Sequence, residues 1–568
     1  MEKQLSQLLQ ALEQELVSSN RFHWNSPLSG APQSQTSENP LITSLCFDSR
    51  SACPGSLFFA LPGIHVHGNT FIPQALERGA AAIIYQDQLP EAVQEVISQR
   101  RQQGLTVPPL LQVPDSRFAM SPIADCFYDS PSSKLVVIGV TGTEGKSSTV
   151  SFVWQLLRLM GKKAGFISTV QYSLGGDAIP NPEHQTTPEA PIVQRQLQEM
   201  VQAGCEYAVV ESSSHGLSPR TNRLGDVQFD GALWMNVTQE HLEFHGTYQQ
   251  YRDDKANLFR ALDRHDHQKT IGGQLRQVPA FGIVNLEDPA AEHFVQATKS
   301  PVMGFTSHGE AGRGSSFVAE NSPDIPFVEA KNIGLKQDGT GISFRLGGNA
   351  AGLAGKEFVV EAPTSGAFNA YNIMAAALAV STTTSLPLEQ VLAQAASLEP
   401  VTGRMTVVDC GQPFRVIVDY AHTPSSFQTI FPPLRKEITG RIFAVFGSGG
   451  ERDTTKRPEQ GRIAARWCDV VVLADEDPRG EDSMALLEDI AAGCRQEGKL
   501  DESSGLLIIP HRQTAIRRAF FIAQAGDLVL LLGKAHENSI IYKDFVMPYD
   551  EIAEAKSALA EMGYKGNT

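Results

Sequence analysis

The fold of this chain is decided by the sequence Val136-Val137-Ile138-Gly139-Val140-Thr141-Gly142-Thr143-Glu144-Gly145-Lys146-Ser147-Ser148. It starts with a short apolar run rich in β-branched residues, which is typical of a buried strand. A turn with glycines follows, and a helical pattern opens at Lys146. In such a unit backbone N–H groups surround phosphate oxygens, the lysine neutralises charge and the serine hydroxyl is a Mg²⁺ ligand. The stretch therefore predicts a loop that binds ATP.

The glycine spacing differs from the common nucleotide-binding pattern. G-x-x-x-x-G-K-[ST] requires glycine at position 140, where this chain has Val140, and the glycines stand at 139, 142 and 145 instead. Glycine-rich turns also precede helices that bind no ligand. Lys146 and Ser147, in register with the last glycine, favour the nucleotide-binding interpretation.

Composition narrows the class of protein. The 568 residues are 41% apolar and 19% charged, which is typical of a globular protein of about three or four domains. A net charge of −16 argues against nucleic acid or an anionic membrane as partner. Apolar runs stay well below the ~18 residues of a membrane span, and the amphipathic N-terminus does not resemble a signal peptide. The seven cysteines are scattered singly, so we expect reduced thiols and a cytoplasmic location.

Three α/β domains are expected, at residues 1–131, 132–400 and 401–568. A helical segment over about 5–17 and a loop over 26–40 precede alternating strands and helices in the first domain. The central domain follows the phosphate loop with strands at 207–211, 229–236 and 280–285, which predicts a mostly parallel sheet, and residues 306–360 suggest an antiparallel excursion. Short apolar strands at 414–419, 442–446, 470–474, 506–509 and 528–532 predict a second doubly wound, Rossmann-like domain.

Polar residues at strand ends beside the loop are candidates for metal binding. Glu211 ends one strand, where a Mg²⁺ ligand is expected, His241 follows the next strand, and Lys255 opens a helix. Taken singly, each has a structural or surface interpretation as well, and histidine is an unusual ligand for a hard metal.

The ordered motifs resemble those of the Mur ligases, the ATP-dependent amide-forming enzymes of peptidoglycan precursor synthesis. The resemblance spans about residues 45–562 and is greatest to the MurE type, which adds a diamino acid to UDP-N-acetylmuramoyl-L-Ala-D-Glu. The motifs are DSR (48–50), GTEGKS (142–147), TTP (186–188), ESSSHGL (211–217), EHLEFHG (240–246), YxxxK (251–255), GAFNAYN (366–372), GRM (403–405), DYAHTP (419–424), GSGGERDTTKRP (447–458), EDPRGED (476–482) and GKAHE (533–537).

The resemblance implies an ATP site with two Mg²⁺ ions. Lys146 would contact the phosphates, Ser147 one Mg²⁺, and Glu211 with His241 the second. Lys255 matches a lysine that CO₂ converts to a carbamate, which makes a cation into an anionic metal ligand. The implied ATP-binding residues are Gly142, Thr143, Gly145, Lys146, Ser147, Asn285, Asn369, Asn372, Arg404 and Asp419, and His422 matches a position whose role stays open.

The implied reaction transfers the γ-phosphoryl group to the D-Glu carboxylate, and the amine then attacks the acyl phosphate. Catalysis would rest on positioning and charge stabilisation rather than on a covalent enzyme nucleophile. The residues that match UDP-substrate contacts are Ser49, Arg50, Thr186, Thr187, Ser213 and Arg223. The residues that match amino-acid contacts are Arg452, Asp477, Arg479, Gly533 and Glu537.

Four departures from the family pattern stand out. Glu144 replaces the usual loop Asn, and glutamates flank His241 in place of aspartates. The arginine after SSHGL is displaced, so that Arg220 and Arg223 both remain candidates, with Arg223 favoured by its distance to the next strand. Glu476-Asp477 replaces Asp-Asn in the motif that marks meso-diaminopimelate enzymes. Asp477 favours L-lysine or L-ornithine, whereas Arg479 still suits meso-diaminopimelate.

Other functions compete with this interpretation. A folylpolyglutamate synthase-like ligase shares the ATP site but lacks counterparts of the N-terminal DSR block. A catalytically silent relative that binds nucleotide or UDP-sugar is disfavoured by the joint presence of Lys146, Glu211, His241 and Lys255. A generic P-loop kinase is disfavoured by Val140. We expect a monomer that works on small molecules, with no nucleic-acid partner and no membrane insertion, and whose domains close around the substrates.

Overall fold

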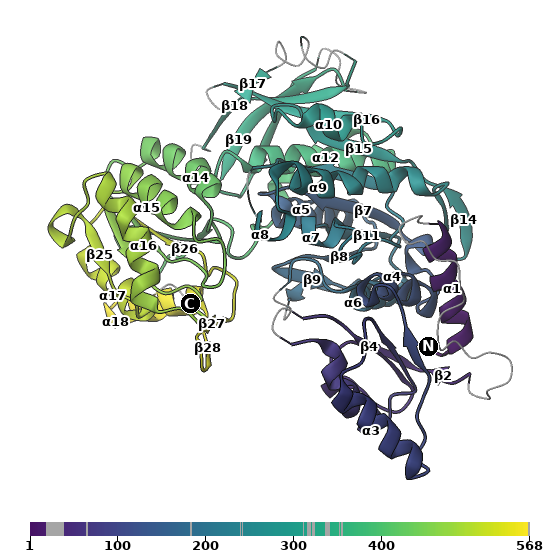
Figure 1. Cartoon of the computed structure of the whole chain (residues 1–568). Helices are drawn as coiled ribbons and strands as arrows, with labels where there is room; N and C mark the ends of the chain where they lie inside the picture. Colours follow the sequence, from purple (N-terminus) through teal and green to yellow (C-terminus); the bar gives the residue numbers. More distant parts are fainter. Residues whose placement is uncertain are drawn as a thin grey trace.

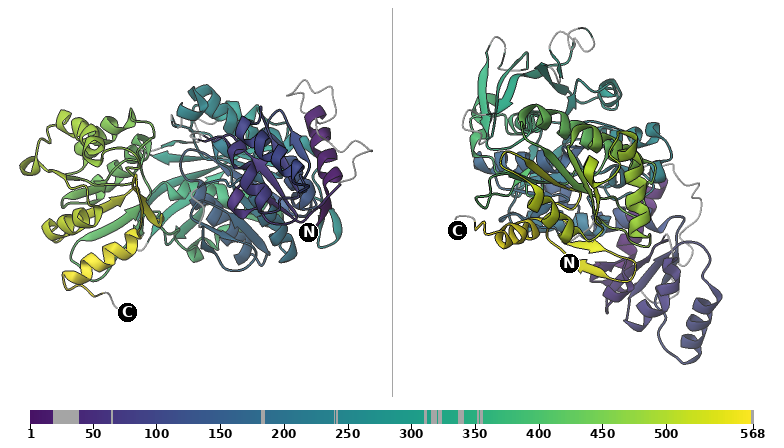
Figure 2. Two further views of the ribbon diagram at one scale, coloured as in Figure 1. Left: turned by 60° about the horizontal axis from the view of Figure 1, so that its bottom comes forward. Right: turned by 90° about the vertical axis from the view of Figure 1, so that its left-hand side faces the viewer.

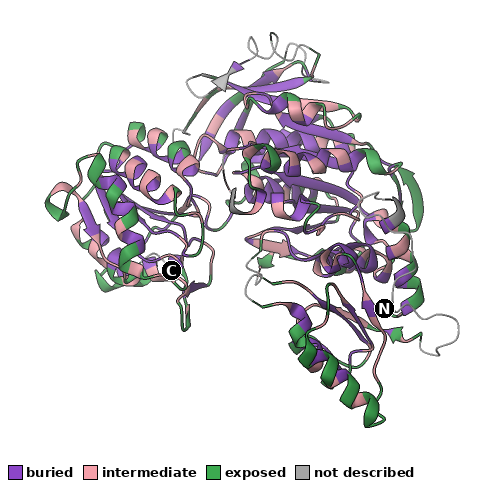
Figure 3. Cartoon of the chain, in the orientation of Figure 1, coloured by how far each residue is buried: buried purple, intermediate pink, exposed green. Residues whose placement is uncertain are grey.

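The computed structural model describes residues 1–18, 39–63, 66–181, 185–238, 240, 242–309, 312–314, 320, 324–335, 341–350, 353 and 356–565. Within these residues the chain forms three main sheets, each the middle layer of a sandwich with helices on both faces (Figure 1). The left view of Figure 2 also separates the C-terminal sheet from the other two. Strands are buried in all three, and exposed residues lie on outer helix faces such as that of α3 (Figure 3). The expected loop over 26–40 falls largely outside the described residues.

The N-terminal sheet is parallel, with the order β3-β4-β5-β6. Successive residues of β4 point to opposite faces: Leu57 and Phe59 pack with α1 and α4, Phe58 with α2 and α3. The elements are β1 (Lys3–Gln4), α1 (Leu5–Ser18), β2 (Leu41–Ile42), β3 (Ser44–Cys46), β4 (Ser56–Ala60), α2 (Ile72–Glu77), β5 (Ala82–Tyr85), α3 (Glu91–Gln102), β6 (Leu110–Gln112) and α4 (Ser116–Phe127).

The central sheet has twelve strands among the described residues, in the order β10-β9-β8-β11-β7-β12-β15-β16-β18-β19-β20, with β17 on β16. Pairing is parallel from β8 to β18 and antiparallel at both ends. The strands are β7 (Val136–Thr141), β8 (Ala164–Ile167), β9 (Gln171–Ser173), β10 (Ile179–Pro180), β11 (Tyr207–Glu211), β12 (Gly231–Trp234), β15 (Phe281–Asn285), β16 (Val302–Gly309), β17 (Gly312–Arg313), β18 (Phe327–Leu335), β19 (Ile342–Gly348) and β20 (Phe358–Ala362); β13 (Gln268–Ile271) and β14 (Gln274–Gln277) form a separate hairpin.

Helices cover both faces of the central sheet because its strands are apolar on both sides. Val136 and Ile138 of β7 pack with α5 and α12, whereas Val137 packs with α6 and α9. Gly139 lies under α9, where a Cβ would come 2.4 Å from Leu258 Cδ1, so this glycine permits the close approach of that helix. The helices are α5 (Lys146–Leu159), α6 (Ala190–Gln202), α7 (Ser214–Leu217), α8 (Leu242–His245), α9 (Tyr248–Ala261), α10 (Ala291–Val295), α12 (Asn369–Thr384) and α13 (Leu388–Leu392).

The C-terminal sheet has the order β21-β22-β26-β23-β24-β25 and is parallel except for β21. Helices α14 to α16 pack on one face, and α17 with α18 on the other. The elements are β21 (Thr406–Val407), β22 (Arg415–Asp419), α14 (Pro424–Glu437), β23 (Ile442–Phe446), α15 (Lys456–Trp467), β24 (Val470–Leu473), α16 (Ser483–Gln496), β25 (Leu506–Ile508), α17 (Arg512–Ile522), β26 (Leu528–Leu532), β27 (Ser539–Ile541), β28 (Val546–Pro548) and α18 (Glu551–Glu561).

Both ends of the connection between the central and C-terminal sheets are bonded to α5. Gln155 donates from Nε2 to the carbonyl of Glu399 at 3.0 Å and accepts from its N–H at 2.7 Å. Five residues later, Arg404 Nη2 donates to Ser147 Oγ at 3.2 Å. The helix that begins at the phosphate loop therefore holds the start and the end of residues 399–404.

The structure confirms the α/β class, the mostly parallel central sheet, the antiparallel excursion and the second doubly wound sheet. Among the described residues, no helix is both long and apolar enough to cross a bilayer.

Candidate active site

The phosphate loop joins β7 to α5 and is held by its neighbours. Gly145, at φ +83°, precedes the first turn of α5, and a Cβ there would come 2.7 Å from Asn372 Oδ1. Thr143 N donates to the Asn236 carbonyl at 2.9 Å, which anchors the loop to the end of β12. Lys146 Nζ donates to the Thr143 carbonyl at 2.8 Å, so its ammonium group lies over the loop, where phosphates are expected.

Glu211, the last residue of β11, lies beside Ser147 in the first turn of α5. Ser147 Oγ donates to Glu211 Oε1 at 3.1 Å, in a buried environment. Ser168 Oγ and Thr169 N donate to Glu211 Oε2 at 2.5 and 2.9 Å. These donors fix the orientation of the carboxylate, as outer partners do around metal ligands. The hydroxyl and carboxylate oxygens are ligands that Mg²⁺ prefers.

Lys255 is buried against the loop from the opposite side. Its Nζ donates to the Gly142 carbonyl at 2.7 Å and lies 4.4 Å from the centre of the Tyr251 ring. Burial, and after it the charge of Lys146, holds the pKa of Lys255 well below its usual value. A neutral amine is the form that reacts with CO₂, so this position suits the expected carbamate.

His241 lies outside the described residues. Its neighbour Glu240 is described, and Glu240 Oε1 lies 3.7 Å from His422 Nε2 of the C-terminal domain. His422 Nδ1 also bonds to the Tyr420 carbonyl at 2.9 Å. Glu144 lies in the same region, where burial, and then the charge of Glu240, raise its pKa to about 7.

The residues expected around the nucleotide come from both domains. Asn372 Nδ2 donates to Asn369 Oδ1 at 2.8 Å on the first turn of α12, and Asn372 Oδ1 accepts from Thr149 at 3.2 Å. Asn285, at the end of β15, donates to the Met235 carbonyl at 2.9 Å. Arg404 reaches Ser147 and lies over the Tyr420 ring at 4.6 Å.

Asp419 ends β22 beneath Arg404. Its carboxylate accepts from Met405 N and Ala421 N at 2.8 Å each, while burial raises its pKa above the usual value. The structure thus brings the candidate ribose carboxylate within the same region as the phosphate loop.

Three of the six residues expected at the UDP-substrate form a hydrogen-bonded network with Glu211. Thr187 Oγ1 donates to the Glu211 carbonyl at 2.9 Å and accepts from Ser213 N at 3.0 Å. Arg223 Nη1 donates to the Thr187 carbonyl at 2.9 Å. Arg220 instead donates to the Phe244 carbonyl at 2.5 Å. Arg223 is therefore the arginine that lies beside the Thr187 segment.

The remaining substrate candidates do not join this network. Ser49 Oγ donates to Gln74 Oε1 at 2.6 Å, and Arg50 forms an exposed ion pair with Asp48 at 2.7 Å in the N-terminal domain. Thr186 is half-buried next to Thr187.

A buried lysine lies between two of the carboxylates expected at the amino-acid site. Lys534 Nζ donates to Asp477 Oδ1 at 2.9 Å and forms an ion pair with Glu537. Asp477 Oδ1 also accepts from Ile541 N at 2.9 Å, and Glu537 accepts from the Tyr420 hydroxyl at 3.2 Å. Asp477 therefore already has a cationic partner within the protein.

Glu476 differs from its neighbour. Its Oε2 is buried and, among the described residues, has no hydrogen-bond partner. It faces Gly533, where a Cβ would come 2.7 Å from Oε2, and Gly533 N donates to the Asp419 carbonyl at 3.1 Å. Burial raises the pKa of Glu476 to about 7.

The two arginines expected at the amino-acid site differ in their surroundings. Arg479 has a left-handed backbone, with φ +53°, and Arg452 is exposed.

Sequence reasoning missed several residues of these networks. Lys534 and Glu476 were inside recognised motifs but were given no role. Glu189 accepts from Arg117 of α4 at 3.0 Å and from Arg223 at 2.9 Å, so it joins the N-terminal domain to the substrate network. The sequence signal that could have identified Glu189 is its position directly after the TTP motif (186–188). Ser168 and Thr169 carried no motif at all.

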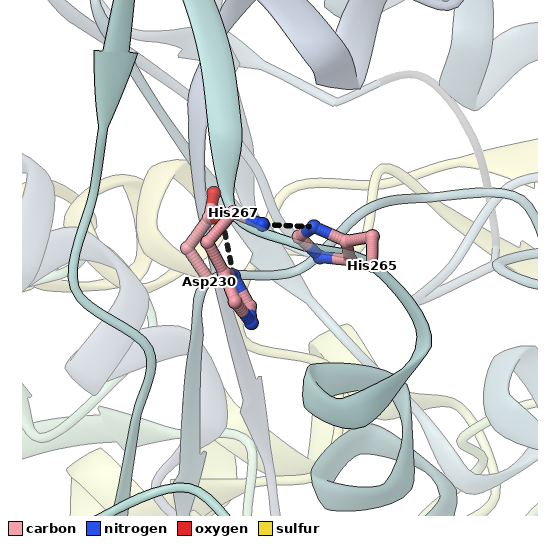
Figure 4. A group of neighbouring side chains, drawn as sticks. All are labelled: Asp230, His265 and His267. Carbon is pink, nitrogen blue, oxygen red and sulfur yellow. Dashed lines mark hydrogen bonds and ion pairs between the residues drawn. The ribbon is translucent and has the colours of Figure 1, made fainter.

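A second cluster, Asp230, His265 and His267, has the composition of a metal site (Figure 4). Its atoms already have protein partners: His267 bonds to Asp230 Oδ1 at 2.9 Å and to the Leu262 carbonyl at 2.7 Å, and His265 Nε2 bonds to the Phe229 carbonyl at 2.8 Å. The buried Lys269 ammonium lies 3.1 Å from Asp230 Oδ2. This cation would oppose a metal ion, so the cluster is a structural polar network.

Comparisons with known proteins agree with this geometry. Residues 41–119 match the family described as Mur ligase family, catalytic domain, residues 140–380 the Mur ligase middle domain, and residues 403–535 the Mur ligase, glutamate ligase domain. A UDP-N-acetylmuramyl-tripeptide synthetase of Treponema denticola is 49% identical over 92% of this chain and 94% of its own length. A UDP-N-acetylmuramoyl-L-alanyl-D-glutamate–2,6-diaminopimelate ligase of Geobacillus kaustophilus is 37% identical over 92% of this chain and 96% of its own.

Solved structures share the fold. The structure of a UDP-N-acetylmuramoyl-L-alanyl-D-glutamate–2,6-diaminopimelate ligase, 24% identical, aligns with a TM-score of 0.56 over 94% of this chain and 98% of that one. The three matched domains and the full-length relatives lead to one conclusion: the chain belongs to the Mur ligase family and is a ligase of the MurE type.

Proposed function

We propose that this ATP-dependent ligase joins a diamino acid to the D-Glu carboxylate of UDP-N-acetylmuramoyl-L-Ala-D-Glu, with L-lysine or L-ornithine favoured over meso-diaminopimelate. Tripeptide synthesis for peptidoglycan is supported by the names of the full-length relatives. The observation that carries the site assignment is the hydrogen-bonded path from Arg404 through Ser147 and Glu211 to Thr187. It connects the expected nucleotide, metal and muramoyl-peptide residues in one region.

The proposed chemistry has two steps. The D-Glu carboxylate attacks the γ-phosphorus of ATP, which forms an acyl phosphate and releases ADP. The amine of the incoming amino acid then attacks the acyl carbon, and phosphate leaves as the amide forms and the nitrogen loses a proton. In both steps negative charge spreads over phosphoryl and carbonyl oxygens, so a preorganised cation such as Lys146 lowers the barrier.

The residues present suit the expected ions. Ser147, Glu211 and the carbamate of Lys255 would hold Mg²⁺ together with His241, and the ions would neutralise charge on the transferring phosphoryl group. The ligand oxygens of Ser147 and Glu211 lie 3.1 Å apart, which supports two neighbouring cation sites. The depressed pKa of the buried Lys255 supports carbamate formation.

The choice of amino acid rests on Glu476 rather than on Asp477. Lys534 pairs with both Asp477 and Glu537, so part of the negative charge of Asp477 is already compensated within the protein. Glu476 Oε2 has no partner among the described residues and faces Gly533. A terminal ammonium group would supply the missing donor and stabilise the ionised carboxylate. The additional carboxylate of meso-diaminopimelate would instead bring a second negative charge, for which Arg479 and Arg452 are the expected partners.

The test measures phosphate release from ATP and UDP-N-acetylmuramoyl-L-Ala-D-Glu with meso-diaminopimelate, L-lysine or L-ornithine in separate reactions. We expect release with L-lysine or L-ornithine and its loss in Glu476→Gln, while the exposed control Glu292→Gln keeps wild-type activity. Release only with meso-diaminopimelate would overturn the proposed specificity. No release with any of the three, from protein that binds ATP, would overturn the activity and favour a silent relative.

The expected domain limits of 1–131, 132–400 and 401–568 are part of the proposal, as are a monomeric state and a cytoplasmic location. Support for a reducing compartment comes from the seven cysteines, all of which are free thiols in the structure.

A further inference from the structure

Glu144 occupies the phosphate loop where the family pattern has Asn, and the backbone of the loop fixes its direction. Asn236 Oδ1 accepts from Glu144 N at 2.8 Å, and Asn236 Nδ2 donates to the Glu144 carbonyl at 3.2 Å. Because both backbone groups are held on the central domain, the side chain is free to extend toward the C-terminal domain.

The Glu144 carboxylate meets the start of α14 there. Thr423 Oγ1 donates to Glu144 Oε1 at 3.2 Å. Thr423 is the N-cap of this 14-residue helix, and its Oγ1 also accepts from Ser426 N at 3.1 Å. The hydroxyl therefore caps the helix and binds the carboxylate at the same time. A negative charge at this end is also favoured by the helix dipole.

Two neighbouring contacts join the same segments. Thr238 Oγ1 donates to Ser425 Oγ at 3.1 Å, and Glu240 Oε1 lies 3.7 Å from His422 Nε2. Residues 422–425 thus contact the central domain through His422, Thr423 and Ser425, and the Thr423 contact is made to the phosphate loop itself.

We propose that Glu144 is a positioning residue that docks α14, and with it the amino-acid site, onto the phosphate loop. This inference rests on the proposed function, because it assigns the C-terminal domain to the incoming amino acid. An asparagine side chain is one methylene shorter and uncharged, so it would lose both reach and the attraction to the helix N-terminus.

The change in ATP affinity when Glu144 is replaced distinguishes a docking role from a role in stabilising the loop. Glu144 lies beside the place where triphosphate is expected, and like charges repel. Glu144→Gln should therefore bind ATP as tightly as the wild type or more tightly. The glutamine oxygen can still accept from the Thr423 hydroxyl, but the bond is no longer made to a charged group, which should raise the KM for the amino acid about fivefold. A residue that only stabilised the loop would weaken ATP binding when replaced.

The experiment compares Glu144→Gln, Glu144→Asp, Thr423→Ser and Thr423→Val with wild-type protein, and uses Glu292→Gln as a matched change of charge on an exposed site. Calorimetry measures ATP-analogue affinity, and steady-state assays measure the KM for the amino acid. We expect Thr423→Ser to behave as wild type and Glu144→Asp to recover part of the effect. The effects of Glu144→Gln and Thr423→Val should not add in the double variant.

Small-angle scattering gives a measurement that does not depend on turnover. Wild-type protein with ATP analogue and UDP-substrate should be more compact than Glu144→Gln under the same conditions. Equal compactness of the two proteins, or a loss of ATP affinity that matches the rise in KM, would overturn the docking role. Failure of wild-type turnover with every amino acid would overturn the proposed function, and the scattering result would still decide the docking.

Discussion

Replacing Lys269 by methionine tests how the central sheet tolerates its buried polar network. The ammonium group donates to the Ser132 and Gln228 carbonyls at 2.8 Å each and lies 3.1 Å from Asp230 Oδ2. Methionine keeps most of the side-chain volume and removes all three interactions. Breaking a buried ion pair typically costs about 3–5 kcal/mol.

Part of this cost is offset within the network. Asp230 Oδ2 still accepts from Val137 N at 2.9 Å, and His267 Nδ1 remains at 2.9 Å from Oδ1. We therefore expect the low end, about 3 kcal/mol. For a domain of this size that lowers the unfolding midpoint by about 6–12 °C.

Scanning calorimetry measures this shift, and the transition of the central domain is identified by its rise on adding ATP. The double variant Lys269→Met/Asp230→Asn should lose less stability than the sum of the single variants, because the stranded charge is gone. The exposed control Lys299→Met should stay within about 0.5 kcal/mol of wild type. A Lys269→Met shift no larger than that of Lys299→Met, or full additivity with Asp230→Asn, would refute the reasoning.

Three further predictions concern the ATP site. Lys255→Ala should nearly abolish phosphate release, with partial rescue by bicarbonate or a short-chain acid, and wild-type turnover in this variant would contradict the carbamate. In CO₂-depleted buffer, the free energy of unfolding of the wild type relative to Lys255→Met should rise with pH below about 10.5. The reason is that Lys255 binds a proton in the unfolded chain, whereas burial keeps the native amine neutral. Urea titrations at several pH values measure this slope, and a slope of the opposite sign would contradict the lowered pKa. Gly145→Ala should weaken ATP affinity at least about tenfold by calorimetry, since a Cβ would meet Asn372 at 2.7 Å in a left-handed backbone, whereas unchanged affinity would show that the loop adapts.

The sequence predicted elements whose signal is local. The β-branched run before Gly142 became β7, and the helical pattern near Leu5 became α1 (Leu5–Ser18), because apolar periodicity depends on neighbours in the chain. The candidate site needed motifs, because Glu211, Lys255 and Arg404 approach the loop from distant segments.

Pairings between distant residues stayed out of reach. Lys534 and Asp477 are 57 residues apart, and Glu144 and Thr423 are 279 apart. Nothing in either local sequence encodes such a contact, since it depends on how strands and domains are placed. For the same reason the sequence does not predict that Asp477 pairs with Lys534.

The three hydrogen bonds that hold Glu399 and Arg404 to α5 limit how the C-terminal domain can move. A body tied near Ser147 and again near Gln155, two turns further along one helix, pivots more easily around that helix than it slides away from it. The carboxyl ends of β22 and β26 lie beside this pivot, because Met405 N donates to the Asp419 carboxylate at 2.8 Å and Gly533 N donates to the Asp419 carbonyl at 3.1 Å. A rotation about α5 would therefore move Asp419 and Gly533 together with Arg404. We therefore expect the C-terminal domain to rotate about α5 when substrates enter and products leave. Variants of Gln155 would change the range of this rotation without removing a residue that contacts a substrate.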